Sequence, residues 1–339
     1  MKPARPALTF GAGFAALATA GYAAAVGLAR RQSAAGAAQG EIESILDQLL
    51  GELGARGIHN FISTGVGRVH ALELGEGDPP LIFLHGLGAS AGSYCGLIAE
   101  LAKRRRVIAI DRPGSGLSDP VRFRGHPRGA WNQVVAEVAD ALGIGGFDLV
   151  GHSLGGLAAG GFAVDNPDRV GALALLAPVG LSPHLPAGWA VAMVPGVMDL
   201  LWALDRREMG RQVARGEPDI RGVSWGPVQV GRDLVGYRYA VSKRFGRGSD
   251  LDMIPRLMRP FSFYPESLLL PGLGLLADRT LVVWGDQDEQ VALPPAREQL
   301  ATYPRIELRV LSDRDHLFPF EEPRQTAELV STWLTAHAR

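Results

Sequence analysis

Ser153 stands at the centre of a Gly-x-Ser-x-Gly pattern that spans residues 151–155. The largely apolar run 147–150 precedes this pattern and the small-residue stretch 156–161 follows it, an order that predicts a buried strand, a sharp turn and a helix. A turn this tight crowds its neighbours, so glycine is needed two residues before and two residues after the serine. It exposes the hydroxyl above the edge of the sheet and directs the N-terminus of the next helix at the reacting centre. A serine placed in this way is a candidate nucleophile.

The chemical partners that such a serine needs follow it in the sequence. A serine hydroxyl becomes nucleophilic when a neutral imidazole takes its proton and a carboxylate orients that imidazole. The apolar run 281–284 predicts a buried strand, and the turn after it contains two carboxylates, Asp286 and Asp288. Alternating apolar and polar residues predict a last strand over 306–311, and His316 lies in the loop that follows. The sequence therefore predicts a serine, acid and histidine triad with two candidates for the acid.

The elements that must position these residues alternate between strand and helix. Continuous apolar runs predict strands that are buried on both faces, and helical segments lie between them. The predicted strands cover 81–84, 107–110, 147–150 and 170–177, after an opening meander at 61–63 and 69–74, and the predicted helices cover 93–103, 131–142 and 154–165. This alternation fits βαβ units and a parallel sheet.

Four motifs together resemble those of the α/β-hydrolase family. They are His-Gly-Leu-Gly at 85–88, Asp-Arg-Pro-Gly-Ser-Gly-Leu-Ser-Asp at 111–119, the serine pattern at 151–155, and Gly-Asp-Gln-Asp at 285–288 with its downstream histidine. The resemblance implies an α/β fold with a doubly wound, mostly parallel sheet and an inserted helical cap. It also implies a Ser-Asp-His triad that works without a metal or an organic cofactor.

The resemblance assigns a role to each candidate residue. Ser153 is the nucleophile and His316 is the base. The family pattern Gly-x-x-Asp selects Asp288 as the acid, which leaves Asp286 to stabilise the turn. Backbone amides hold the developing negative charge on the substrate oxygen. These oxyanion-hole amides are expected from two residues, Leu87 and Leu154.

Composition excludes several other function classes. The chain has 339 residues, 47% of them hydrophobic, which suits one large domain with an insertion. Its formal net charge of -1 gives no electrostatic footprint for nucleic acid. Cys95 is the only cysteine, so an internal disulfide is excluded. The sequence contains no His-Glu-x-x-His motif, and a metal site has no support.

The interval from Pro178 to about Asp278 breaks the alternation, at the place where the family inserts its cap. It is rich in methionine and tryptophan, and most of these side chains are expected to fill the core of the cap while others face an apolar substrate. They are Met193, Met198, Met209, Met253, Met258, Trp189, Trp202 and Trp225. The predicted function is hydrolysis of a moderately apolar small-molecule carboxylic ester through an acyl-enzyme. Alternatives are hydrolysis of a carbon–carbon bond or an amide by the same triad, or a non-enzymatic ligand receptor on the same fold.

The N-terminal region differs from the rest of the chain. Residues 7–29 contain no charged side chain and are flanked by basic residues on both sides. Their length predicts one membrane anchor of unassigned orientation, and the alternatives are a cleaved export signal or a soluble surface helix. Apolar residues at helical spacing predict an amphipathic helix over 41–53, which can dock on the hydrolase body, on a membrane or on a second chain.

These features divide the chain into five segments. Residues 1–40 form the anchor or signal with its linker, and 41–57 contain the amphipathic helix. The hydrolase core occupies 58–178 and 279–339, and the cap occupies 179–278. The expected partners are a small apolar ester and a membrane contacted through residues 7–29.

Overall fold

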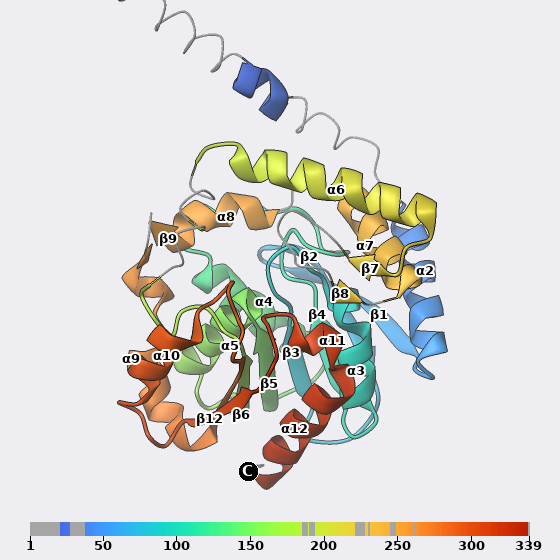
Figure 1. Cartoon of the computed structure of the whole chain (residues 1–339). Helices are drawn as coiled ribbons and strands as arrows, with labels where there is room; N and C mark the ends of the chain where they lie inside the picture. Colours follow the sequence, from blue (N-terminus) through green and yellow to red (C-terminus); the bar gives the residue numbers. More distant parts are fainter. Residues whose placement is uncertain are drawn as a thin grey trace, which may run out of the picture.

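The computed structural model describes residues 21–27, 38–184, 189, 194–220, 228–229, 231–244, 249–259 and 262–337. Its centre is one eight-stranded sheet with the order β1-β2-β4-β3-β5-β6-β11-β12, covered by helices on both faces (Figure 1). The strands of this sheet are β1 (Gly57–Thr64), β2 (Gly67–Leu74), β3 (Leu81–Leu84), β4 (Val107–Ile110), β5 (Phe147–His152), β6 (Val170–Leu176), β11 (Thr280–Gly285) and β12 (Glu307–Leu311). The core helices are α2 (Gln39–Glu52), α3 (Cys95–Ala102), α4 (Arg128–Ala141), α5 (Leu154–Asp165), α9 (Leu270–Leu273), α10 (Leu293–Leu300), α11 (Phe318–Glu321) and α12 (Pro323–Ala336).

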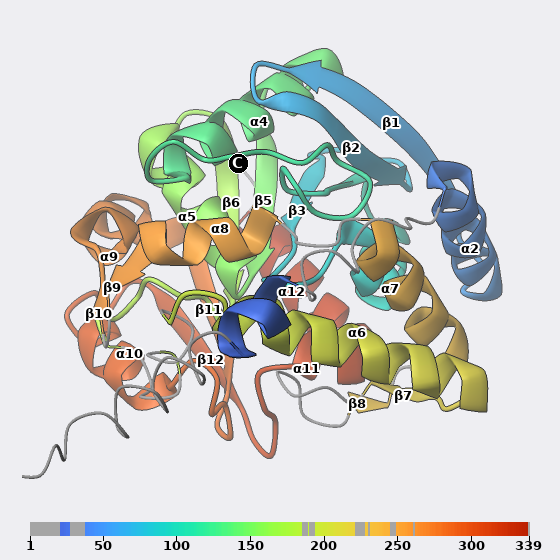
Figure 2. The ribbon, with the colours of Figure 1, turned by 90° about the horizontal axis from the view of Figure 1, so that it is seen from above.

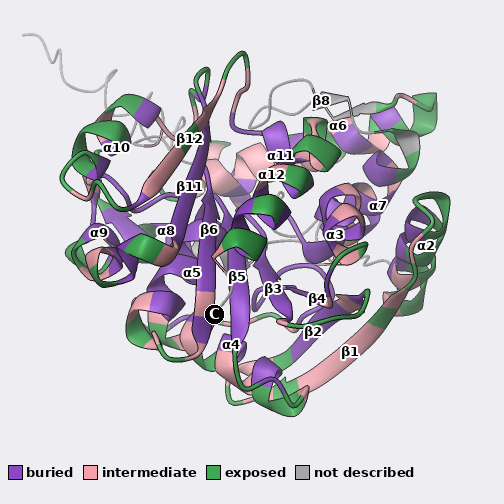
Figure 3. Cartoon of the chain, turned by 90° about the horizontal axis from the view of Figure 1, so that it is seen from below, coloured by how far each residue is buried: buried purple, intermediate pink, exposed green. Residues whose placement is uncertain are grey.

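The predicted mostly parallel sheet is confirmed. All strand pairs from β4 to β12 are parallel, whereas β1 with β2 and β2 with β4 are antiparallel. Every residue of β3, β4 and β5 is buried (Figure 3), because α3 and α12 pack on one face of the sheet and α4 and α5 pack on the other. Parallel strands end at one common edge, so the loops after β3, β5, β11 and β12 meet there.

A helical cap lies between β6 and β11, in the interval that broke the alternation. It contains α6 (Val197–Arg215), α7 (Arg232–Arg244) and α8 (Ser249–Leu257), and α6 runs across the top of the molecule in Figure 1. Two short β ladders accompany these helices, β7 (Asp219–Ile220) with β8 (Val228–Gln229) and β9 (Met258–Arg259) with β10 (Ser262–Phe263). Among the predicted core residues of the cap, Met209, Met253 and Met258 are buried. Met193 and Trp225 lie outside the described residues.

The N-terminal region packs on the body in two places. Ile42, Leu46 and Leu50 of α2 are fully buried, and α2 contacts α3 and the cap helix α7. Residues 21–27 form a helical segment beside the start of α6 (Figure 2), where the hydroxyl of Tyr22 donates to the carbonyl of Pro195 at 2.5 Å.

No helix within the described ranges is both long and apolar enough to span a membrane. The predicted apolar helix over 7–29 falls mostly outside those ranges, because residues 7–20 and 28–29 are not described.

Candidate active site

The predicted elbow forms at the junction of β5 and α5. Ser153 is the single residue between the strand and the helix, and it adopts φ 54° and ψ -118°. A positive φ is unfavourable for a residue with a Cβ, so the surrounding structure must hold it in place. Its backbone amide donates to the carbonyl of Leu176 at 2.9 Å, and its carbonyl accepts the amide of Val179 at 3.2 Å. These two bonds tie the strained turn between β5 and α5 to the end of β6 and the residues that follow it.

The glycines on both sides of the serine are required by space, as the sequence predicted. A Cβ added at Gly151 would lie 2.2 Å from the carbonyl oxygen of Gly155. A Cβ added at Gly155 would lie 2.0 Å from the carbonyl oxygen of Leu84, the last residue of β3. The start of α5 therefore approaches the end of β3 at backbone contact, which brings the serine next to the loop that follows β3.

The structure brings Asp288 and His316 together. Nδ1 of His316 lies 2.7 Å from Oδ2 of Asp288, and both side chains are buried. The other carboxylate oxygen, Oδ1, accepts the backbone amides of Gln290 at 2.9 Å and Val291 at 2.8 Å. Because the carboxylate only accepts, the neutral imidazole must have its proton on Nδ1, which leaves Nε2 free to act as the base.

The other nearby carboxylates do not contact the imidazole. Asp286 is exposed on the turn after β11, where its amide donates to the carbonyl of Leu311 at 3.0 Å. Asp315 accepts the amide of Leu317 at 2.6 Å. The choice of Asp288 over Asp286 by the Gly-x-x-Asp pattern agrees with this geometry.

The histidine loop lies against the elbow. The rings of His152 and His316 are 4.8 Å apart between centroids, and Nε2 of His152 lies 2.9 Å from the carbonyl oxygen of His316. Within the described ranges the hydroxyl of Ser153 has no hydrogen-bond partner. Catalytic hydrogen bonds are often long in structures without substrate, and they tighten when substrate binds.

The loop expected to form the oxyanion hole passes beside the serine. A Cβ added at Gly86 would lie 3.3 Å from the Cβ of Ser153. Among the described residues, the backbone amides of Leu87 and Leu154 donate to no acceptor. The oxyanion-hole role of the Leu87 and Leu154 amides stays a prediction.

The motif at 111–119 supports this loop rather than the elbow. The buried guanidinium of Arg112 donates to the carbonyl oxygens of His85 at 3.0 Å and Gly86 at 2.9 Å. Oδ1 of Asp111 accepts the amide of Ala91 at 2.7 Å, further along the same loop. These side chains reach across to the loop after β3, a contact for which the local sequence has no signal.

Two further buried residues, which the sequence did not mark as functional, contact this machinery. They are His152, at the variable position of the elbow, and Tyr94, just before α3. The hydroxyl of Tyr94 lies 2.6 Å from Nδ1 of His152 and 3.3 Å from the amide nitrogen of Gly86. On its other side the Tyr94 ring packs on Phe320, with the centroids 4.3 Å apart.

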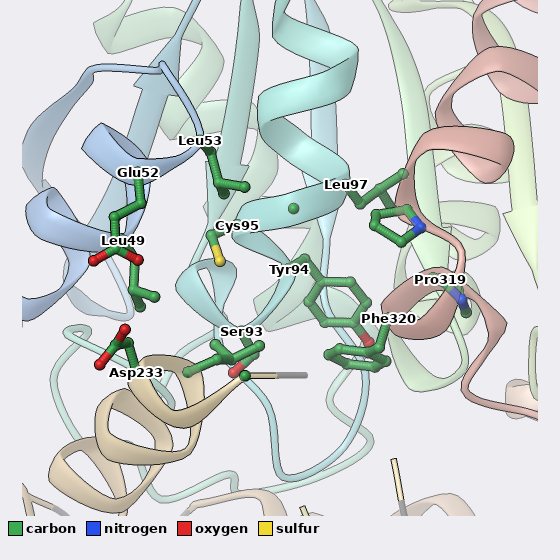
Figure 4. A pocket seen from close by; sticks show the side chains of 14 residues that line it. Leu49, Glu52, Leu53, Ser93, Tyr94, Cys95, Leu97, Asp233, Pro319 and Phe320 are labelled. Carbon is green, nitrogen blue, oxygen red and sulfur yellow. The ribbon is translucent and has the colours of Figure 1, made fainter. Parts of the chain in front are cut away.

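Tyr94 and Phe320 also form a wall of a cavity of about 240 Å³ (Figure 4). This cavity lies between α2, α3, α7 and α11, and Leu49, Cys95 and Asp233 line its other sides. No member of the triad lines it. Tyr94 therefore borders this cavity and also contacts His152 through its hydroxyl.

Comparison with known proteins shows the same fold with several activities. A family profile described as the alpha/beta hydrolase fold matches residues 79–323. The chain is 30% identical to a 2-hydroxy-6-oxononadienedioate/2-hydroxy-6-oxononatrienedioate hydrolase of Comamonas testosteroni over 279 residues, which cover 78% of this chain and 88% of the relative. It is 29% identical to the dihydrolipoyllysine-residue acetyltransferase component of an acetoin cleaving system of Cupriavidus necator, with 80% of this chain and 68% of the relative covered. The carboxylesterase CesB of Bacillus subtilis matches with a TM-score of 0.65 at 21% identity, over 88% of this chain and 98% of that structure.

Proposed function

The chain belongs to the α/β-hydrolase family, and from this premise we propose that it is a serine hydrolase that cleaves carboxylic esters of moderately apolar small molecules. The proposal rests on one observation, the buried bond between Asp288 and His316 beside the strained elbow of Ser153. A carboxylate, an imidazole with a free Nε2 and a serine at the turn between a strand and a helix are the parts that acyl transfer needs. The relatives include hydrolases, which supports an enzyme of this kind.

The mechanism follows from the roles of these groups. Oγ of Ser153 attacks the ester carbonyl carbon while Nε2 of His316 takes the hydroxyl proton. Asp288 stabilises the imidazolium, and the amides of Leu87 and Leu154 hold the oxyanion. The imidazolium then gives its proton to the leaving alkoxide, and the C–O bond breaks to form an acyl-enzyme. Water attacks this ester, with His316 again taking a proton, and its breakdown releases the acid and restores the serine.

The cap supports an apolar substrate. Met198 and Trp202 on α6 are half-buried and pack against the core rather than projecting into solvent. Flexible methionine side chains suit binding surfaces that adapt to differently shaped apolar groups. The apolar composition of the cap is the reason for proposing a substrate with an apolar acyl or alcohol part.

Hydrolysis of a carbon–carbon bond is the second candidate, because of the Comamonas relative. Its named substrates are 2-hydroxy-6-oxononadienedioate and 2-hydroxy-6-oxononatrienedioate, which have a ketone and no ester, so their hydrolysis must break a carbon–carbon bond. The same triad can serve both reactions, since the bond that is cleaved depends on the pocket and the leaving group. A panel of p-nitrophenyl esters and one vinylogous diketone would separate the two by their kcat/KM values.

A fluorophosphonate probe provides the direct test of the nucleophile. We expect the probe to label the wild-type chain and not Ser153→Ala, and p-nitrophenyl ester turnover to disappear in that variant while its melting temperature is retained. Ester turnover that survives in Ser153→Ala would falsify the assignment. A folded wild type that neither binds the probe nor turns over any ester or diketone would favour the receptor alternative.

We further propose that residues 7–29 attach the protein to a membrane. The support is the uncharged stretch itself with its basic flanks. Removal of residues 2–20 leaves the Tyr22 contact with the cap in place and deletes most of the apolar stretch. We expect full-length protein in the membrane fraction of cells and the shortened chain in the supernatant. Full-length protein in the supernatant would contradict the attachment.

A further inference from the structure

Three buried hydrogen bonds form an unbroken chain from the oxyanion loop to the catalytic base. The first joins the amide nitrogen of Gly86 to the hydroxyl of Tyr94 at 3.3 Å. The second joins this hydroxyl to Nδ1 of His152 at 2.6 Å, and the third joins Nε2 of His152 to the carbonyl oxygen of His316 at 2.9 Å. Tyr94, His152 and His316 are each less than 5% exposed.

The chemistry of the two end groups fixes the donor and acceptor of each bond in this hydrogen-bond chain. The amide of Gly86 can only donate, so the oxygen of Tyr94 accepts there. The carbonyl of His316 can only accept, so Nε2 of His152 must have a proton. A neutral His152 then presents a bare Nδ1, which accepts the one proton of the Tyr94 hydroxyl. Every donor has an acceptor, and only this tautomer of His152 satisfies all three bonds.

Burial keeps His152 and Tyr94 neutral, as the hydrogen-bond chain requires. It lowers the pKa of His152 well below the usual value, and repulsion from a protonated His316 lowers it further. Burial also raises the pKa of Tyr94. His152 therefore stays neutral even during the step in which His316 becomes an imidazolium, and the direction of the bonds does not reverse during catalysis.

The aromatic packing holds both side chains in place independently of these bonds. The Tyr94 ring contacts Phe83 and Phe320, with centroid distances of 4.9 and 4.3 Å. The His152 ring meets Phe318 and Phe320 edge-on. Removal of the Tyr94 hydroxyl alone should leave this packing intact, so the contribution of the hydrogen bonds can be measured separately.

We propose that Tyr94 and His152 are positioning residues that hold the oxyanion amides and the His316 loop at one fixed spacing around Ser153. The inference rests on the proposed hydrolase function and adds two residues to it. Among the described residues, neither side chain forms a hydrogen bond with the Ser153 hydroxyl or with the His316 imidazole, although the His152 ring packs against the ring of His316. Tyr94 acts through the peptide of Gly86, next to the amide of Leu87, and His152 acts through the backbone of His316. A shift of either loop would misplace a group that must meet the substrate within hydrogen-bond distance.

Four variants test the proposal with p-nitrophenyl butyrate. Tyr94→Phe removes one hydroxyl and should lower kcat by about tenfold, the effect of one buried hydrogen bond, with KM unchanged. His152→Leu should lower kcat at least as far. His152→Gln should recover part of that loss, because its amide nitrogen is the same number of bonds from Cβ as Nε2 of histidine. Tyr237→Phe is the matched control, since Tyr237 is equally buried and, among the described residues, its hydroxyl bonds only to Ser90.

A spectroscopic measurement tests the chain without turnover. In protein labelled with ¹⁵N-histidine, the resonances that vanish in His152→Gln belong to His152. We expect them to show the neutral tautomer protonated at Nε2 in the wild type, and a mixture of tautomers in Tyr94→Phe. A merely structural role for Tyr94 would not change the tautomer.

Three results would overturn the proposal. They are a kcat of Tyr94→Phe within twofold of the wild type, an equal loss in Tyr237→Phe, or a wild-type His152 protonated at Nδ1. A wild type that is inert to substrate and to the fluorophosphonate probe would instead refute the proposed function. In that case the tautomer measurement alone still decides whether the hydrogen-bond chain exists.

Discussion

Replacement of Asp288 by Asn tests the catalytic arrangement most directly, because the structure fixes how the amide would sit. Oδ1 of Asp288 accepts two backbone amides, from Gln290 and Val291. In Asp288→Asn the carbonyl oxygen must keep that position, since an amide NH₂ group there would face two donors. The NH₂ group must then face Nδ1 of His316. Because an NH₂ group only donates, Nδ1 must accept and cannot have a proton. The imidazole is forced into the opposite tautomer, with its proton on Nε2.

An imidazole protonated on Nε2 cannot take the proton of Ser153. The expected loss of kcat is about 10⁴-fold, as in other triads with a reversed tautomer, or about 5 kcal/mol at 1.36 kcal/mol for each decade. Steady-state hydrolysis of p-nitrophenyl butyrate, corrected by active-site titration, measures this loss. The matched control is Asp286→Asn, which changes an exposed carboxylate two residues earlier on the same turn. The reasoning is refuted if Asp288→Asn keeps more than a tenth of the activity, or if Asp286→Asn falls as far.

Three further predictions concern stability and reactivity. Because the pKa of His152 is lowered in the folded chain, the unfolded chain binds a proton below about pH 6.5 that the folded chain does not. The free energy of unfolding therefore falls by about 1.4 kcal/mol for each pH unit below that value through this residue. Urea unfolding at pH 6.5 and 5.5 should show a smaller fall in the free energy of unfolding for His152→Gln than for the wild type. Burial raises the pKa of the Cys95 thiol to about 11. Iodoacetamide at pH 7.5 should therefore modify Cys95 only after the chain unfolds. Rapid modification of the folded chain would contradict this burial. Gly155→Ala should lower the free energy of unfolding by about 3 kcal/mol, because the added Cβ would collide with the carbonyl oxygen of Leu84. Gly51→Ala, in open space on α2, should instead raise it by up to about 1 kcal/mol. Thermal melts that rank the two variants in the opposite order would disprove this.

The central sheet could be predicted because its strands are buried on both faces. The runs at 81–84 and 107–110 are continuously apolar, and they coincide with β3 and β4. The strand β1 was expected only over 61–63, although it extends over Gly57–Thr64. It lies at the edge of the sheet, where its residues are half-buried or exposed, and its sequence therefore mixes polar and apolar side chains without strict alternation.

The positions of the proposed triad were predictable because its members lie in the turns and loops after β5, β11 and β12, where sequence pattern and topology agree. The groups that fix the loops were not. Arg112 reaches the carbonyls of His85 and Gly86, and Tyr94 reaches His152, a residue 58 positions away. Such contacts depend on how the loops after different strands meet in space, and a single sequence has no local signal for them.

The loop that contains Asp288 is also fixed by contacts with other parts of the chain, and one of these contacts comes from the cap. The amides of Gln290 and Val291 orient Asp288, and the carbonyls of these same two residues accept indole protons. Trp189 of the cap donates to Gln290 at 2.9 Å, and Trp284 of β11 donates to Val291 at 3.0 Å. The backbone that donates to Oδ1 of Asp288 is therefore itself held by two hydrogen bonds, one from Trp189 and one from Trp284. Since one of these two bonds comes from the cap, the orientation of the acid depends on where the cap lies, although the cap contributes no member of the triad.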